Sequence, residues 1–159
     1  INLLTALAAS AVIGLFDKTI EQVVALAVLM PIVASMGGIA GSQVLTLVIR
    51  GQAVGHLSGA NFRWLFNREI IVAGINGVLW ALVIALITLL WFRDAGIAVI
   101  IAAAIIINLL VAAVTGAALP LILKARGIDP ALAGGVILTT VTDVIGFLSF
   151  LGLATLFYL

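Results

Sequence analysis

Long apolar runs separated by short polar stretches make up most of the chain. About 20 predominantly apolar residues suffice for a helix to cross a bilayer. The pattern predicts five helices, at residues 1–16, 21–50, 70–92, 95–123 and 130–159. The first is short for a membrane span, as expected if the sequence is a fragment whose first helix is cut at its start. We therefore expect an all-α integral membrane protein with five transmembrane helices per chain.

The polar stretches between these runs predict where the helices begin and end. Residues 50–69, which read RGQAVGHLSGANFRWLFNRE, form the longest polar connection, and we expect a loop with an amphipathic start to the next helix. Arg93 and Asp94 predict a tight turn. Asp129 followed by Pro130 predicts the start of the last helix, because aspartate is a favoured N-cap residue and proline is favoured at the first helical position.

The last predicted helix carries one ionisable side chain, Asp143, near its middle. A carboxylate at the centre of a membrane helix costs about 2.5–3.5 kcal/mol on insertion scales, so it needs a water-filled cavity, a partner or an ion. On a helical wheel it lies on a stripe of small and polar residues, the others being Gly135, Thr139, Thr142, Gly146 and Ser149. Because the opposite side is apolar, we expect lipid on one side and a bundle interior or a pore on the other.

The second predicted helix carries a similar stripe. Pro31, Ser35, Gly38, Ser42 and Thr46 recur at spacings of three and four, which places them on one helical face. Proline removes one backbone hydrogen bond and glycine loosens the helix. Irregular backbone at membrane depth is tolerated only where it is buried in protein or lines a water-filled cavity. The stripe therefore indicates a second pore-lining element.

Structural explanations remain open for both stripes. An interhelical hydrogen bond to Asn76 or Asn108 would also account for Asp143. Small residues such as Gly37, Gly38 and Gly41 are the ordinary means by which membrane helices pack closely. For Asn76 and Asn108 themselves, hydrogen bonding between helices is favoured over binding of a substrate.

Composition and charge narrow the class of protein. The chain has 159 residues, of which 65% are hydrophobic and 8% charged, against about 25% charged in soluble domains. Cysteine is absent, which excludes thiol chemistry and a cysteine metal site. The net charge is +1, and the sequence shows no basic face that would bind the backbone of a nucleic acid. The composition is that of a protein embedded in a lipid bilayer.

The positions of lysine and arginine predict the orientation. The connections after the second and fourth helices hold five basic residues, against two in the other connections (Lys18 and Arg93). These five are Arg50, Arg63, Arg68, Lys124 and Arg126. Under the positive-inside rule both basic connections lie in the cytoplasm. Five spans then place the N-terminus in the cytoplasm and the C-terminus outside, in the inner (plasma) membrane of the cell.

The chemistry of Asp143 suits a cation. Mg²⁺ prefers oxygen ligands, dehydrates reluctantly and is usually held by one or two carboxylates plus waters. One carboxylate per chain makes a poor site, but a two-fold dimer would present two facing each other across the axis. A divalent ion would neutralise both charges, whereas a monovalent ion would not.

Two segments resemble the membrane domain of the MgtE family of magnesium channels. They are MPIVASMGGIAGSQVLTLVIRGQAVG at residues 30–55 and DPALAGGVILTTVTDVIGF at residues 129–147, and the resemblance extends over residues 1–159. It implies a homodimer with a pore along the two-fold axis, lined by the second and fifth helices. The pore aspartate of the family falls on Asp143, and further pore positions fall on Ser35, Gly38, Ser42, Gly135 and Thr139. The resemblance also implies regulatory cytoplasmic CBS domains in the full-length protein, which this sequence does not contain.

The sequence departs from the family at two positions of the second helix. The family segment usually reads G-G-N-x-G-N/T-Q, whereas this chain reads GGIAGSQ, with Ile39 and Ser42. Two amide oxygens near the expected ion path are thereby replaced. The departure bears on ion preference rather than on architecture.

Three functions follow from these expectations. The leading one is a channel for a largely hydrated divalent cation, Mg²⁺ first, with Mn²⁺ or Co²⁺ as further ions. The alternative is a proton- or sodium-coupled divalent-cation transporter that uses Asp143 as a titrating site. A third is an intramembrane aspartyl protease, which also needs two aspartates, but the residues around Asp143 do not resemble protease motifs. We therefore expect no enzyme activity and no resident cofactor.

Overall fold

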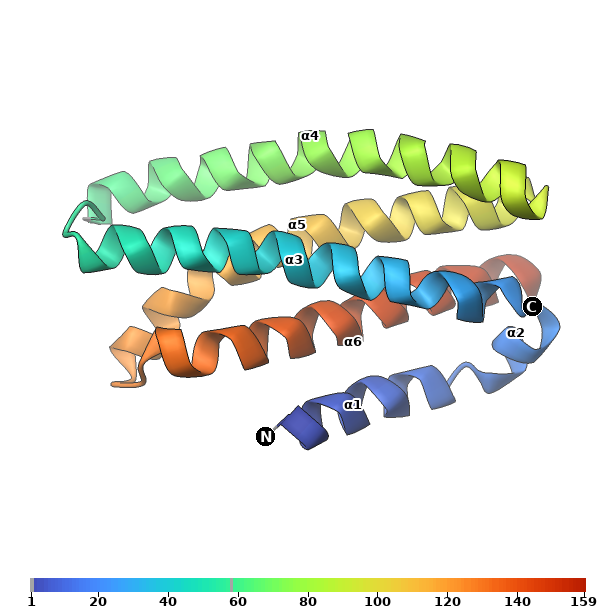
Figure 1. The fold of residues 1–159 in the computed structure, drawn as a ribbon, viewed down its shortest axis with the longest axis horizontal. Coiled ribbons are helices and arrows are strands. Elements are labelled where there is room, and N and C mark those ends of the chain that lie inside the picture. Colours follow the sequence, from blue (N-terminus) through green and yellow to red (C-terminus); the bar gives the residue numbers. More distant parts are fainter. Residues whose placement is uncertain (1, 58) are drawn as a thin grey trace.

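The computed structural model describes residues 2–57 and 59–159. Within these residues the chain forms helices and no strands. The helices are α1 (Asn2–Gly14), α2 (Asp17–Gln22), α3 (Ala25–Ala53), α4 (Gly59–Phe92), α5 (Ala95–Ala125) and α6 (Pro130–Tyr158). Figure 1 shows α3, α4, α5 and α6 running lengthwise along the molecule.

Four of the described helices, α3 to α6, are long and apolar enough to cross a membrane. Each has at least 29 residues, more than the about 20 that a bilayer requires. Helix α1 is apolar but has 13 residues, which is shorter than that length. The predicted all-helical membrane class is therefore confirmed, with four candidate spans in the described part of the chain.

The predicted loop within residues 50–69 is much shorter than expected, and the predicted amphipathic start of the next helix takes up most of the stretch. Helix α3 continues to Ala53 and α4 begins at Gly59, so most of this stretch is helical. Leu65 is buried and packs against Val48 of α3 and Ala117 of α5. The rings of Phe62 and Phe66 lie 5.8 Å apart on the same side of α4. The apolar residues of this amphipathic start are three to four positions apart, and burial of the face that they form favours helix.

Two aspartates begin the helices after the short turns. The Asp129 carboxylate accepts a hydrogen bond from the backbone N–H of Ala131 (2.9 Å), which confirms the predicted N-cap of α6. The Asp94 carboxylate accepts from the N–H of Gly96 (2.7 Å) at the start of α5. Its second oxygen accepts from the hydroxyl of Tyr158 (2.9 Å). This contact joins the first turn of α5 to the last turn of α6.

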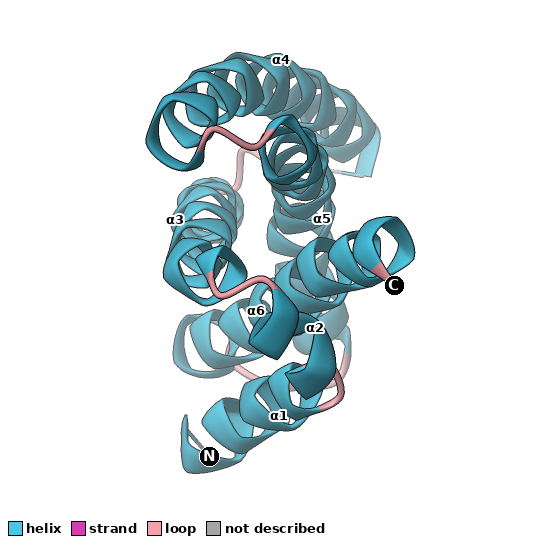
Figure 2. Cartoon of the chain, turned by 90° about the vertical axis from the view of Figure 1, so that its right-hand side faces the viewer, coloured by secondary structure: helices cyan, strands magenta, loops and turns pink. Residues whose placement is uncertain are grey.

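Helix α5 is the central element of the bundle. It packs against α3, α4 and α6, and it contains more buried residues than any other described helix. The end-on view in Figure 2 shows α3 and α5 between α4 on one side and α6 on the other, with α1 beyond α6. Both α3 and α4 pack along α5 and have little contact with each other.

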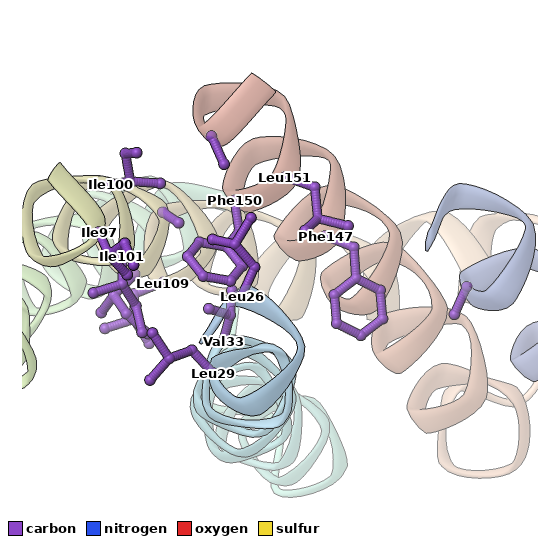
Figure 3. Close-up of a cluster of buried hydrophobic side chains, with 14 residues drawn as sticks. Leu26, Leu29, Val33, Ile97, Ile100, Ile101, Leu109, Phe147, Phe150 and Leu151 are labelled. Atoms are coloured by element: carbon purple, nitrogen blue, oxygen red, sulfur yellow. The ribbon is translucent and has the colours of Figure 1, made fainter. Parts of the chain in front are cut away.

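The largest buried cluster joins α3, α5 and α6 at one end of the molecule (Figure 3). Leu26, Leu29 and Val33 extend from α3 and meet Phe150 and Leu151 of α6. Isoleucines of α5, including Ile97 and Ile101, complete the cluster. Close packing of this kind holds membrane helices together, since lipid supplies little hydrophobic driving force between helices. It fixes α3 beside α6, the two helices that carry the predicted stripes.

The basic residues of the predicted cytoplasmic connections belong to one end of the bundle. Helices α3 and α5 end there, and α4 and α6 begin there (Figure 1). Arg50 and Lys124 lie in the last turns of α3 and α5. The charge asymmetry in the sequence thus corresponds to an asymmetry between the two ends of the molecule. We refer to the end with Arg50 and Lys124 as the basic end.

Candidate functional site

An open groove of about 910 Å³ runs between α3 and α6. Its lining comprises Ala34, Ser35, Gly38, Ile39, Ser42, Gln43 and Thr46 of α3 and Thr139 and Asp143 of α6. The α3 residues recur at spacings of three and four, which is the period of one helical face. Asp143 is the one ionisable residue among those that line the groove. We call this the pore-side groove, after the pore that the sequence resemblance implies.

The structure brings together five of the six residues predicted for an ion path. Ser35, Gly38 and Ser42 line the groove from α3, and Thr139 and Asp143 line it from α6. The sixth, Gly135, lies one turn before Thr139, is exposed, and does not line the groove. Its carbonyl oxygen accepts a hydrogen bond from the Thr139 hydroxyl (3.1 Å). Gly135 therefore lies next to the groove.

The Asp143 carboxylate is partly buried and makes no hydrogen bond or ion pair with the described residues. The predicted alternative partners lie elsewhere. Asn108 bonds to a backbone carbonyl of α3, and Asn76 lines a different groove beside α4. Within the described part of the chain, the structural explanation for Asp143 is thus not realised. A carboxylate without a protein partner in a membrane helix needs water or an ion.

Hydroxyl groups near Asp143 donate backwards along their own helices. Ser42 donates to the carbonyl of Gly38 (2.8 Å), and Thr139 donates to the carbonyls of Gly135 and Val136, each at 3.1 Å. A hydroxyl has one proton to donate and two lone pairs to accept. Because the proton is directed to the helix backbone, the lone pairs remain free to accept hydrogen bonds from water or to ligate a cation. The groove therefore presents acceptor oxygens, which suits a hydrated cation.

The glycines of α3 divide into two roles. A Cβ atom at Gly37 would collide with the side chain of Asn108, and one at Gly41 would lie 2.8 Å from Leu138 of α6. These two glycines are packing positions, as the structural explanation proposed. A Cβ atom at Gly38 would meet its nearest neighbour, Thr139, at 3.9 Å, which is ordinary contact. Gly38 instead lines the groove.

Asn108 joins three helices behind the groove. It is fully buried, and its side-chain N–H donates to the backbone carbonyl of Val33 (2.8 Å). Its amide also fills the space that Gly37 and Gly146 leave, because a Cβ at either position would contact it. The predicted role of Asn108 as a hydrogen-bonding residue between helices is confirmed. It keeps α3 and α6 close enough to form one groove.

The sequence prediction missed Ala34 as a lining residue, although its spacing to Gly38 places the two on one face. It also gave Gln43 no specific role. Gln43 lines the pore-side groove and, in addition, the second groove between α3 and α4. No sequence pattern marks a residue that lies on the ridge between two grooves.

The family model for MgtE, described as a divalent cation transporter, matches residues 30–153. The chain belongs to the MgtE family. It is 32% identical over 151 residues to the magnesium transporter MgtE of Bacillus subtilis (strain 168), and the match covers 95% of this chain and 34% of that protein. It is 30% identical over 159 residues to the magnesium transporter MgtE of Thermus thermophilus, covering 98% of this chain and 34% of that protein. This chain thus spans about a third of the length of these MgtE relatives.

The matched region contains both walls of the pore-side groove, from Ser35 to Asp143. A family of divalent cation transporters is a family of transport proteins and not of enzymes. The protease hypothesis for Asp143 is therefore set aside. The resemblance that the two sequence segments suggested is confirmed for most of the chain.

Proposed function

We propose that this chain is the membrane pore domain of a magnesium channel. The observation that carries the proposal is the groove of about 910 Å³ between α3 and α6, with Asp143 as the one ionisable residue among those that line it. Relatives that match nearly the whole chain are named magnesium transporters. Asp143 binds the ion and neighbouring oxygens hold its water shell.

The size of the groove supports passage of a largely hydrated ion. A water molecule occupies about 30 Å³ in the liquid, so a groove of this volume has room for on the order of 30 waters. Mg²⁺ dehydrates reluctantly and usually keeps several of its waters. The ion therefore keeps most of its water shell. Water molecules of that shell bridge the ion to Asp143, Thr139 and Ser42.

A homodimer with its two-fold axis along the groove completes the pore. Ile39 lines the groove and is 62% exposed in the single chain. A second copy facing this surface covers Ile39 and brings a second Asp143 to the axis. Two carboxylates balance one divalent cation, and a two-fold interface supplies them from identical chains. In this assembly α3 and α6 line the pore, and α1 serves as a fifth membrane helix of each chain.

The basic end faces the cytoplasm in this proposal. Arg50 and Lys124 lie at that end, and short cytoplasmic connections are enriched in such residues. The N-terminus is then cytoplasmic and the C-terminus is outside, in the plasma membrane. Residues 1–159 form the pore domain, and cytoplasmic CBS domains regulate the full-length protein. Mn²⁺ and Co²⁺ resemble Mg²⁺ in charge and are further candidate ions.

One observation also favours a coupled transporter. The Asp143 carboxylate has no hydrogen-bonding partner in the described residues, so no protein group holds it in one protonation state. A site that binds and releases a proton would couple Mg²⁺ movement to a proton gradient. The channel has no such requirement, because the Mg²⁺ gradient alone drives the flux.

Flux into liposomes tests the channel proposal. The purified chain is reconstituted around a Mg²⁺-sensitive dye, with a Mg²⁺ gradient and with proton and sodium gradients removed. We expect uptake by the unmodified chain and loss of uptake in Asp143→Asn, while Glu21→Gln, an exposed carboxylate of α2, retains it. Uptake that requires a proton or sodium gradient would favour the coupled transporter. Undiminished uptake in Asp143→Asn would contradict both functions.

A further inference from the structure

A second groove of about 240 Å³ lies on the other side of α3, between α3 and α4. Helix α5 forms its floor through Leu109 and Ala113. The polar residues that line it are Gln43 of α3 and Glu69 and Asn76 of α4. The groove exists because α3 and α4 both pack along α5 and barely touch each other.

Gln43 and Glu69 line this groove from two neighbouring helices, each about three turns from the end where the helices are joined. Gln43 is ten residues before the end of α3 at Ala53, and Glu69 is ten residues after the start of α4 at Gly59. The two helices are joined at those ends and run in opposite directions (Figure 1). Asn76 is two turns further along α4, about 10 Å away along the axis. Glu69 and Gln43 therefore line one groove from two facing helices, and Asn76 lines it further along α4.

Glu69 lies where water and ions can enter. It precedes Phe92, the end of α4, by 23 residues, which is about 35 Å of helix. The hydrocarbon core of a bilayer is about 30 Å thick. If Phe92 marks one edge of the core, Glu69 is at the opposite edge, near the basic end. The carboxylate is thus partly buried but not sealed in lipid.

No basic side chain neutralises Glu69 among the described residues. It forms no ion pair or hydrogen bond there. The guanidinium group of Arg68, the preceding residue, lies over the ring of Trp64 at 5.6 Å from its centroid. Arg68 and Trp64 line a separate groove on α4. A carboxylate at the membrane edge without a protein partner is stabilised by water or by a bound cation.

We propose that Glu69 and Gln43 form a second divalent-cation site, distinct from the one at Asp143. The Glu69 carboxylate and the Gln43 amide oxygen ligate the ion, and water molecules complete its shell, one of them bonded to Asn76. Mg²⁺ usually keeps several waters beside one or two carboxylates, and here the Gln43 amide oxygen supplies a second protein ligand beside Glu69. The volume of the groove corresponds to about eight waters at 30 Å³ each, which accommodates a partly hydrated ion.

Gln43 connects this site to the pore-side groove. Gln43 lines both grooves, but its one amide oxygen cannot ligate an ion in each groove at the same time. Occupation of the second site therefore withdraws the Gln43 amide from the pore. Binding at the two sites is then linked, and by thermodynamic necessity the linkage is reciprocal.

Manganese binding tests this site independently of ion conduction. The detergent-purified chain is titrated with Mn²⁺, and the concentration of free Mn²⁺ is measured by electron paramagnetic resonance. The variants carry Asp143→Asn, which disables the site in the pore-side groove. We expect Asp143→Asn to bind one Mn²⁺ per chain, and the added change Glu69→Gln to weaken that binding at least tenfold. Gln43→Leu on the same background weakens it several-fold, and Glu21→Gln leaves it unchanged.

Two results would overturn the second site. One is an absence of Mn²⁺ binding in Asp143→Asn, and the other is equal affinity with and without Glu69→Gln. Glutamine has nearly the size of glutamate, and an unchanged thermal unfolding temperature verifies that the variant is folded. If instead the channel proposal fails because Asp143 binds no ion, the unmodified chain and Asp143→Asn bind the same number of Mn²⁺ ions. That result differs from both results that overturn the second site.

Discussion

The side-chain amide of Asn108 donates a hydrogen bond to the backbone carbonyl of Val33, at 2.8 Å and fully buried between α5 and α3. Val33 lies in the largest apolar cluster (Figure 3), one turn before the glycine against which the Asn108 amide packs. The contact fixes the position of α3 at Val33, directly before Ala34 and Ser35, the first residues of α3 that line the groove. The geometry of the proposed ion path thus depends on a residue that does not line it.

Removing the Asn108 amide should loosen the bundle. Asn108→Ala loses the bond to Val33, and hydrogen bonds between membrane helices are worth about 0.6 kcal/mol on average and about 1.7 kcal/mol at most. Truncation of a packed side chain adds to that loss. Thermal unfolding in detergent should show a lower midpoint for Asn108→Ala. Asn76→Ala is the matched control, because Asn76 is exposed and makes no hydrogen bond within the described residues; an equal loss of stability in both variants would contradict the assigned role.

Adjacent glycines of α3 should respond differently to the same change. Gly37→Ala places a methyl group against Asn108, and overpacking of this kind typically costs about 1–3 kcal/mol. Gly38→Ala has room, with Thr139 at 3.9 Å, and alanine favours helix over glycine by about 1 kcal/mol. We expect Gly37→Ala to lower thermal stability. Gly38→Ala should keep stability and reduce Mg²⁺ flux, because its methyl group enters the groove; the reverse pattern would contradict the division between packing and lining glycines.

Ile39 offers a test of how the groove holds the water shell of the ion. It lines the groove and is largely exposed, so Ile39→Asn places an amide oxygen where an apolar side chain now lies. One added hydrogen bond contributes about 1 kcal/mol. We expect the Mg²⁺ concentration for half-maximal flux to fall about fivefold, as that energy implies. Ile39→Leu is the control that changes shape without adding an oxygen, and it should leave this concentration unchanged.

The bond between Tyr158 and Asp94 should affect stability and not transport. Tyr158→Phe removes one hydrogen bond of 2.9 Å and should cost about 1 kcal/mol. Asp94→Ala removes that bond and also the N-cap of α5, so it should cost about 1 kcal/mol more. Both residues are at the end of the bundle opposite the basic end, away from the pore-side groove. Unfolding midpoints test the ranking, and a loss of Mg²⁺ flux in folded Tyr158→Phe would show that this end also controls the pore.

Local patterns in the sequence predicted the parts of the structure that depend on helical period and on caps. The period of three to four residues placed Ser35, Gly38 and Ser42 on one face, and that face lines the groove. Asp129 with Pro130 predicted the start of α6 correctly. These features are encoded within a few residues, so they can be read without knowledge of the tertiary structure.

The sequence could not reveal features that depend on partners from distant helices. The acceptor for Asn108 is a backbone carbonyl, and every residue of α3 has one, so no sequence pattern identifies Val33. Helical period separates Gly37 from Gly38, but it does not reveal that the side chain of Asn108 occupies the space beside Gly37. The sequence does not show where the loop ends and the amphipathic start of α4 begins, because the start depends on packing of residues such as Leu65 against α3 and α5.

The position of a bound divalent ion relative to Asp143 tests the central claim most directly. Crystals of the chain grown with Mn²⁺ would give an anomalous scattering signal specific to that ion. The channel proposal predicts a peak on a two-fold axis, between the Asp143 carboxylates of two copies, that disappears in Asp143→Asn. A dimer that holds the two Asp143 residues far apart, or a groove peak that persists in Asp143→Asn, would contradict it.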